Sequence, residues 1–214
     1  LALDVPGDFA TIQEAIDVAC PADTIRVAAG NHSGPGNRML DPGGVDLVIL
    51  GTGGPAGTII DCEGSGPAFL FQSGETAATV LDGFTIHNAS SGAGQGAITV
   101  VGAAPLIRNC AITGSHSPSG AALHVDGGAP IVESSTISAN FASERGGGLY
   151  VTGGATLDFS GSIVSGNCAG MGGTQVWTDA TVSFTCSAVD STGVVGPVRY
   201  LADDEIDDPE VRAP

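Results

Sequence analysis

The alternation of apolar and polar positions repeats along most of the chain. Five segments carry the same short pattern, in which one apolar residue follows another after five positions. The pairs are Leu81/Ile86, Ile107/Ile112, Val132/Ile137, Phe159/Val164 and Phe184/Val189. The second member returns every 25 to 27 residues. A fixed period in this range indicates a solenoid, in which each repeat buries its apolar face only against its neighbours.

A second set of apolar positions keeps nearly the same period. These positions are Leu70, Ile98, Leu123, Leu149 and Val176, which are spaced by 25 to 28 residues. Each repeat thus holds three short alternating runs separated by Gly, Ser, Asn and Pro, a pattern that is typical of strands and turns rather than helices. One repeat is therefore predicted to form one turn, or coil, of a parallel β-helix.

The amino-acid sequence of these coils resembles that of a known family. Segments such as PLIRNCAI (105–112), together with the Gly-rich turns, are similar to the right-handed parallel β-helix repeat proteins of the pectin-lyase-like superfamily. The resemblance covers most of the chain. It implies an all-β fold, a single-stranded right-handed parallel β-helix solenoid of about seven short coils with an N-terminal capping helix. The same fold carries lyases, hydrolases, esterases, epimerases, adhesins and structural proteins, so it is a weak guide to function.

Three regions follow one another along the chain. Residues 1–23 are predicted to be an N-terminal cap with an amphipathic helix, because apolar positions 12, 15, 16 and 19 share one helical face and Thr11 with Glu14 has capping-box spacing. Residues 24–191 are predicted to form the parallel β-helix, interrupted by a long irregular loop from Asn31 to Gly44. Residues 192–214 form an acidic C-terminal tail, whose dense carboxylates are typical of a solvated segment.

Composition limits the partners. The 214-residue chain has a formal net charge of −17, no lysine and six arginines. Such a surface repels phosphate backbones and anionic lipids, so the sequence predicts neither a nucleic-acid partner nor membrane insertion. It also repels acidic polysaccharides unless calcium bridges the two. The five cysteines are an odd number, and Cys20–Cys62 and Cys168–Cys186 stay open as disulfide pairs. Cys110 is predicted to be a small core residue, in an inward column with Phe84, Ser135, Ser162 and Ser187.

The strand face that usually carries catalytic residues in this fold is sparse here. Its ten outward positions are Thr85, Ala111, Thr136, Ile163, Ala188, His87, Thr113, Ser138, Ser165 and Asp190. One carboxylate is too few for a paired-acid hydrolase, or for the clustered acids that hold calcium in a lyase. The turns that follow this strand are short, which predicts a nearly flat surface. No catalytic residue is therefore predicted.

The remaining charged and imidazole groups are given structural roles. Arg108 is expected to pair with Glu133 of the next coil rather than to act as a base. His87, His116 and His124 fall in different columns, so they are not expected to converge on a zinc ion. The sequence therefore predicts no metal ligands and no cofactor, with Ca²⁺ required only if the protein were a lyase.

One outward column differs from the others. Phe71, Thr99, His124, Tyr150 and Trp177 directly follow the inward apolar positions of the second set. The rings of the last three are expected on successive rungs, about 4.8 Å apart. Such a ladder suits stacking against sugar rings or packing on another protein, although the rings can instead stack on one another and stiffen the sheet. Phe71, His124, Tyr150 and Trp177 are the candidate ligand-binding residues.

Two functions follow from these observations. The favoured one is a secreted, non-catalytic β-helix module of a surface, adhesive or structural kind, which binds a polysaccharide or another protein subunit through the aromatic ladder. The alternative is a calcium-dependent lyase or epimerase acting on acidic polysaccharide, with its site in the Asn31–Gly44 loop or completed by another subunit. An extracellular or cell-surface location is implied by the resemblance alone. Exposed solenoid ends also predict self-association.

Overall fold

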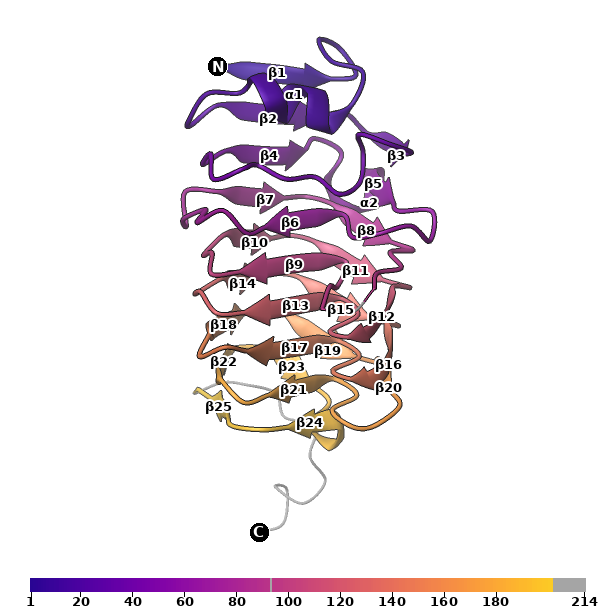
Figure 1. Ribbon diagram of the computed structural model, residues 1–214, viewed down its shortest axis with the longest axis vertical. Coiled ribbons are helices and arrows are strands. Elements are labelled where there is room, and N and C mark those ends of the chain that lie inside the picture. The colour runs from indigo at the N-terminus through magenta and orange to yellow at the C-terminus, as the bar shows by residue number, and fades with distance from the viewer. Residues whose placement is uncertain (93, 202–214) are drawn as a thin grey trace.

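The computed structural model of the chain describes residues 1–92 and 94–201. Its coils stack along one long axis, with the N-terminus at one end of the stack (Figure 1). All pairings between its named strands are parallel. The predicted all-β solenoid of about seven turns is confirmed.

Three long sheets form the walls of the solenoid. Sheet A holds β1 (Ala2–Val5), β2 (Thr24–Val27), β4 (Val48–Gly51), β7 (Val80–Asp82), β10 (Leu106–Arg108), β14 (Ile131–Glu133), β18 (Thr156–Ser160), β22 (Thr181–Thr185) and β25 (Val198–Tyr200). Sheet B holds β3 (Gly30–Ser33), β5 (Thr58–Asp61), β8 (Thr85–His87), β11 (Ala111–Thr113), β15 (Thr136–Ser138), β19 (Ile163–Ser165) and β23 (Ala188–Val189). Sheet C holds β6 (Phe69–Phe71), β9 (Ile98–Val101), β13 (Leu123–Asp126), β17 (Leu149–Thr152), β21 (Val176–Thr178) and β24 (Val194–Val195).

A fourth, smaller sheet lies in the turns between sheets B and C. Sheet D consists of β12 (His116–Ser119), β16 (Phe141–Arg145) and β20 (Cys168–Ala169). The helical segments are α1 (Ile12–Val18), the single turn α2 (Gly54–Gly57) and the 3₁₀ turn η1 (Ser191–Gly193). In the described part of the chain, no helix has the length and apolar character needed to cross a bilayer.

The predicted cap is present, and it includes a strand that the sequence analysis did not predict. Thr11 caps α1, and Glu14 completes the capping box, so two backbone N–H groups at the helix start are satisfied. Ile12, Ala15 and Ile16 turn inward and are buried. Before α1, β1 pairs with β2 and begins sheet A. The winding therefore starts within residues 1–23.

The winding also continues beyond residue 191, where the sequence pattern fades. Val194–Val195 pairs with β21 in sheet C, and Val198–Tyr200 pairs with β22 in sheet A. The Tyr200 ring stacks on Phe184 at a centroid distance of 5.7 Å. The six clustered carboxylates of the predicted acidic tail lie outside the described residues.

The core is built from the inward columns that the period predicts. Sheet A contributes Ile25, Ile49, Leu81, Ile107, Val132, Phe159 and Phe184, each no more than 1% exposed. The strands of sheet A are in register, so one inward residue lies directly over the next. Burying each large apolar side chain is worth about 1.5–3 kcal/mol, and the solenoid adds such contacts coil by coil.

Each coil bends sharply at residues with positive φ. At the bend from sheet A to sheet B these are Gly83, Asn109, Ser134, Gly161 and Cys186, with φ between 47° and 85°. At the end of sheet B they are Asn88, Gly114, Ala139 and Gly166, with φ between 55° and 64°. Left-handed backbone is easy for glycine and tolerated by asparagine, which explains the Gly- and Asn-rich turns.

The residue after each bend points inward, and where it is a serine or an asparagine it accepts a hydrogen bond from a backbone N–H group of the neighbouring coil. Behind the first bend, Ser135 and Ser162 accept hydrogen bonds from the backbone N–H groups of Cys110 and Ser135, at 3.1 and 3.0 Å. Behind the second bend, Asn140 and Asn167 do the same for Ser115 and Asn140, both at 3.1 Å. The inward position of Ser135 and Ser162 was predicted, whereas their hydrogen bonds and the Asn ladder were not. The side-chain oxygens of these ladders thus satisfy backbone N–H groups that are buried at the bends.

Candidate ligand-binding face

Three rings form a column on the outer side of sheet C. The pairing of β13, β17 and β21 sets His124 beside Tyr150 and Tyr150 beside Trp177. The ring centroids of His124 and Tyr150 are 5.2 Å apart. Those of Tyr150 and Trp177 are 4.8 Å apart, with ring planes inclined by 14°. The predicted succession of these rings, here called the aromatic column, is confirmed; their binding of a ligand stays a prediction.

The outward position predicted for Phe71 is wrong. In sheet C, Phe69 pairs with Ile98 and Phe71 with Val100, so Leu70, and not Phe71, continues the column. Phe71 points into the core, is 0% exposed and stacks on Phe69 at 5.8 Å. Three successive buried residues, 69–71, hide the alternation that fixes inside and outside elsewhere. A shift of one residue along a strand exchanges the two faces.

His124 forms the closed end of the aromatic column. Its side chain is buried, and its Nδ1 lies 3.4 Å from the carbonyl oxygen of Ser119. Burial lowers the pKa of His124, which favours the neutral imidazole. Tyr150 and Trp177 are only half-buried, so they are the members of the column that solvent or a ligand reaches.

Glycines allow the turn before each sheet C strand to pass close to these rings. Gly120, Gly146 and Gly173 all have positive φ, between 62° and 69°. A Cβ atom on Gly120 or Gly146 would lie 2.9 or 3.1 Å from Tyr150 Cβ, and one on Gly173 would lie 2.7 Å from Trp177 Cβ. The turns therefore pack directly against the bases of the two half-buried rings.

Arg145 extends the aromatic column towards sheet D. It is exposed at the end of β16, and its Cζ lies 5.0 Å from the centroid of the Trp177 ring, which is a cation–π contact. Arg26, Arg38 and Arg108 are paired with Asp4, Glu63 and Asp82. Arg145 has no ion pair with any residue among 1–92 and 94–201. Its guanidinium N–H groups are thus available beside the column.

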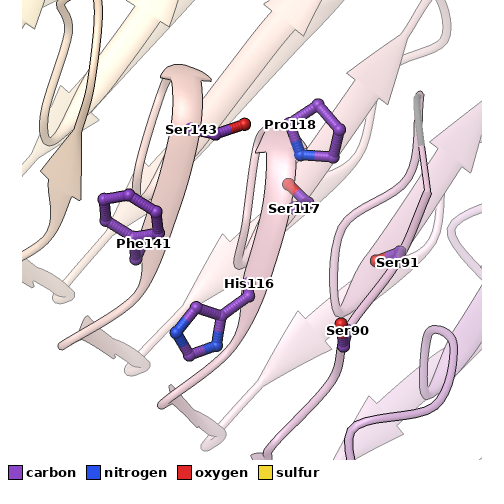
Figure 2. A pocket seen from close by; sticks show the side chains of 7 residues that line it. All are labelled: Ser90, Ser91, His116, Ser117, Pro118, Phe141 and Ser143. Carbon is purple, nitrogen blue, oxygen red and sulfur yellow. The ribbon is translucent and has the colours of Figure 1, made fainter.

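A shallow hollow lies on the outer face of sheet D. It has a volume of about 240 Å³ and is lined by Ser90, Ser91, His116, Ser117, Pro118, Phe141 and Ser143. Figure 2 shows the His116 and Phe141 rings on neighbouring strands, with Ser90 and Ser91 on the preceding coil. The ring centroids of His116 and Phe141 are 5.9 Å apart. The face predicted to be flat therefore contains a hollow, which we call the serine hollow.

The serine hollow and the aromatic column share one side of the molecule. Strand β12 lines the hollow through His116 and ends at Ser119, whose carbonyl oxygen contacts His124. Strand β16 lines it through Phe141 and ends at Arg145, which contacts Trp177. The sequence gives no sign of this continuity, because the two features lie on different sheets and are joined only through the ends of sheet D strands.

A comparison with protein-family models identifies the family to which this architecture belongs. The family described as "Right handed beta helix region" matches residues 41–189, which are 149 of the 214 residues. The chain belongs to the right-handed β-helix family. A comparison with curated proteins and one with solved structures each found no match. Membership of this family establishes the fold but not the function, which has to be argued from the surface residues of this chain.

One ion pair of this β-helix differs from the prediction. Arg108 Nε bonds to Asp82 Oδ2 at 2.8 Å, one coil towards the N-terminus, so the predicted pair with Glu133 is wrong. Both carboxylates flank Arg108 in the register of sheet A. Asp82 also accepts a hydrogen bond at 3.4 Å from the side chain of Asn109, the residue that follows Arg108. This bond holds the Asp82 carboxylate towards Arg108. The same outward column holds a second ion pair, Asp4 with Arg26, two coils towards the N-terminus.

A second pair, Asp61 with His87, was missed. The outward columns of sheet B have the predicted register, but β5 extends them by one coil and adds Asp61 beside His87. The two side chains approach to 3.7 Å. Hydrogen bonds from the N–H of Glu63 and the side chain of Asn88 help to keep the pKa of Asp61 below its ordinary value. The alternation in TIID (58–61) was the available signal.

The three histidines discussed above lie on three different sheets. His87 is on β8, His116 on β12 and His124 on β13. Among residues 1–92 and 94–201, no three His, Cys, Asp or Glu side chains gather closely enough to hold a metal ion.

The cysteines form no disulfide in this structure. All five are free, so neither Cys20–Cys62 nor Cys168–Cys186 is bridged. Cys110 is buried in the predicted inward column. Burial raises the pKa of both Cys62 and Cys110 to about 12. These two thiols are therefore unreactive core groups.

The Asn31–Gly44 stretch, proposed above as the site of an alternative enzyme, was predicted to be an irregular loop throughout, but its first three residues belong to strand β3 and pair with β5. The rest of the stretch braces the cap. Its Asn37 accepts a hydrogen bond from the N–H of Ile12 at 3.1 Å, and the Gly36 carbonyl accepts one from Gln13 at 2.9 Å. Arg38 is paired with Glu63. These contacts satisfy the start of α1 and give the loop a structural role.

Proposed function

We propose that this β-helix is a non-catalytic binding module of the cell surface or extracellular space. Its ligand, a glycan or another protein subunit, lies against the aromatic column. The observation that carries the proposal is the half-buried Tyr150–Trp177 stack with the exposed Arg145 beside it. Aromatic rings with a polar edge, flanked by a cation, are typical of binding surfaces.

The chemistry of these groups indicates how a ligand would be held. Tyr150 and Trp177 stack on each other, so a ligand meets the outward edges of the rings rather than two free faces. Within the described ranges, neither the Tyr150 hydroxyl nor the Trp177 indole N–H makes a hydrogen bond to the protein. Both, with the Arg145 guanidinium, are donors. They match a ligand that is rich in hydroxyl or carbonyl oxygens.

The net charge of the chain narrows the class of ligand further. A chain of formal net charge −17 repels nucleic acids and anionic lipid surfaces, and it repels acidic polysaccharides in the same way. A neutral glycan or a protein partner carries no such penalty. No cofactor is part of this proposal.

Substitution of the two half-buried rings tests the proposal. Binding of the protein to a panel of soluble glycans would be measured by isothermal titration calorimetry, with Trp177→Ala and Tyr150→Ala beside the unchanged chain. Each variant is expected to weaken binding about twofold to tenfold, because an aromatic contact is worth about 0.5–1.5 kcal/mol beyond its area. Val101→Ala, an exposed apolar residue on the same sheet outside the column, is the matched control. Unchanged binding in both ring variants would rule out the column.

The protein-subunit half of the proposal is tested by assembly. Light scattering over a range of concentrations is expected to show self-association that Trp177→Ala weakens if a second copy covers the column. A strict monomer at high concentration, unchanged by the substitution, would reject a second copy as the partner.

A calcium-dependent lyase or epimerase remains the alternative proposal, and it depends on the family resemblance. Release of unsaturated ends from polygalacturonate or alginate in the presence of calcium would favour it over the binding module.

A further inference from the structure

The serine hollow has the chemistry of a site for a small hydroxylated ligand. Its lining combines four serines with one imidazole, one proline ring and one phenyl ring. None of these residues is a carboxylate, a guanidinium or an ammonium group. An anion or cation would find no opposite charge in the hollow, and an anion would also face a protein of net charge −17. A neutral ligand is therefore favoured.

The hydroxyl groups of the hollow are arranged to both donate and accept. Ser117 is 7% exposed and donates its hydroxyl hydrogen to the Ser119 carbonyl at 2.9 Å, which holds the floor of the hollow in place. Ser91 donates to the Gly96 carbonyl at 3.3 Å, and its oxygen lone pairs remain free to accept from a ligand. The hydroxyls of Ser90 and Ser143 make no side-chain hydrogen bond to the described residues and are free to donate. A ligand whose own groups both donate and accept, such as a sugar hydroxyl, satisfies this set.

Phe141 supplies an apolar platform beside these hydroxyls. Its side chain is 44% exposed, although an aromatic ring of this size is usually buried. The strand register puts Ser90, His116, Phe141 and Cys168 on successive rungs of the same outward column. A flat apolar ring next to a row of polar groups fits a ring-shaped ligand with a C–H face and a hydroxyl edge.

We propose that the serine hollow binds one neutral pyranose unit of a glycan, with the C–H face of the sugar on Phe141 and its hydroxyls on the serines. The volume of about 240 Å³ is below the range of roughly 300–1,000 Å³ for drug-sized ligands and suits a single sugar ring. The inference rests on the proposed function in one respect, since a chain that leaves the hollow can run on to the aromatic column. It adds the ligand class and a second contact point.

Two substitutions in the hollow test this inference. Binding of four neutral hexasaccharides, cellohexaose, xylohexaose, mannohexaose and laminarihexaose, would be measured by calorimetry, with hexagalacturonate as the anionic counterpart. At least one neutral hexasaccharide is expected to bind, and hexagalacturonate at least tenfold more weakly. Phe141→Ala should weaken the neutral ligand about fivefold to tenfold, and Ser143→Ala about threefold. Ile163→Ala is the matched control, because Ile163 on sheet B is 45% exposed and lies outside the hollow.

The outcomes separate this inference from the proposed function. Loss of binding in Phe141→Ala but not in Trp177→Ala supports the hollow and rejects the aromatic column. Loss in Trp177→Ala with no change in Phe141→Ala and Ser143→Ala overturns the hollow and leaves the proposed function standing. Equal losses in Phe141→Ala and Ile163→Ala, tighter binding of hexagalacturonate, or no binding of any neutral hexasaccharide would also overturn the hollow. In the last case the protein-subunit form of the proposed function is still decided by light scattering.

Discussion

The buried side chain of Asn140 is expected to be among the most sensitive positions of the solenoid. It lies behind the bend that ends sheet B and is 1% exposed. Its Oδ1 accepts the backbone N–H of Ser115 at 3.1 Å. Its Nδ2 lies 2.9 Å from the carbonyl oxygens of Ile112 and Ser138 and 3.0 Å from Oδ1 of Asn167. One amide thus satisfies polar groups of three successive coils.

The cost of Asn140→Ala follows from the groups that it leaves unpaired. The Ser115 N–H is fully buried and loses its acceptor. The two amide hydrogens of Asn140 can serve two of their three neighbouring acceptors at once, so up to two further oxygens lose a donor. An unsatisfied buried group costs about 1–3 kcal/mol. We expect the free energy of unfolding to fall by about 2–5 kcal/mol.

Urea unfolding followed by circular dichroism measures this change, and Ser138→Ala is the control. Ser138 ends strand β15 just before the bend and is only half-buried, so its substitution should stay within about 0.5 kcal/mol of the unchanged chain. Asn140→Asp keeps the shape and replaces the amide donor by a carboxylate in a buried site. Burial raises the pKa of the introduced carboxyl above its unfolded value, so this variant should lose more stability at pH 7 than at pH 4, relative to the unchanged chain. Equal losses in Asn140→Ala and Ser138→Ala would refute the reasoning.

The bends, the buried thiols and one aspartate give further tests. Ala139→Gly should raise the free energy of unfolding by about 0.5–1 kcal/mol, because φ at Ala139 is 55° and left-handed backbone costs a residue with a Cβ about 1–2 kcal/mol. Gly166→Ala, at the same bend one coil on with open space around it, should lower it; urea unfolding that gives both changes the same sign would contradict this account. Cys62 and Cys110, with pKa values of about 12, should resist a thiol reagent at pH 8 in the native protein and react only in denaturant, as mass spectrometry of the labelled chain would show. Asp46 accepts hydrogen bonds from the hydroxyl and the backbone N–H of Thr76, which lower the pKa of Asp46 below 3.8. The stabilisation by the Asp46 carboxylate is therefore present above that pH and lost as the pH falls below it. Asp46→Asn should thus flatten the acid side of the pH–stability curve, and an unchanged slope would show that Asp46 does not contribute.

The fold could be predicted because its signal repeats. The inward columns through Ile112 and Leu123 return every coil, and errors at one coil are corrected by the next. The capping box of α1 is local and was predicted from two residues, Thr11 and Glu14. The inward position of Ser135 and Ser162 was predicted from the same period, but their hydrogen bonds were not. The Asn ladder was missed although Asn140 and Asn167 stand 27 positions apart, because a buried amide carries no hydrophobic signal in the sequence.

The candidate site could be predicted only in part. His124, Tyr150 and Trp177 were placed correctly because polar or small residues alternate with apolar ones around them. Phe71 was misplaced because its strand is apolar on both faces, so the register there depends on which neighbour Phe69 pairs with. Arg145 was overlooked because it lies on a strand inside a turn.

The sequence by itself determined the period of the coils, the inward face of most strands, the cap helix and the net charge of −17. These properties depend on residue type and spacing, which local chemistry fixes. The tertiary structure alone decided which carboxylate Arg108 binds, that Arg145 lies on Trp177, and that Ser90, His116 and Phe141 enclose one hollow. Each of these depends on contacts between different coils or sheets, where turn geometry and side-chain orientation choose among neighbours that a linear pattern leaves equivalent.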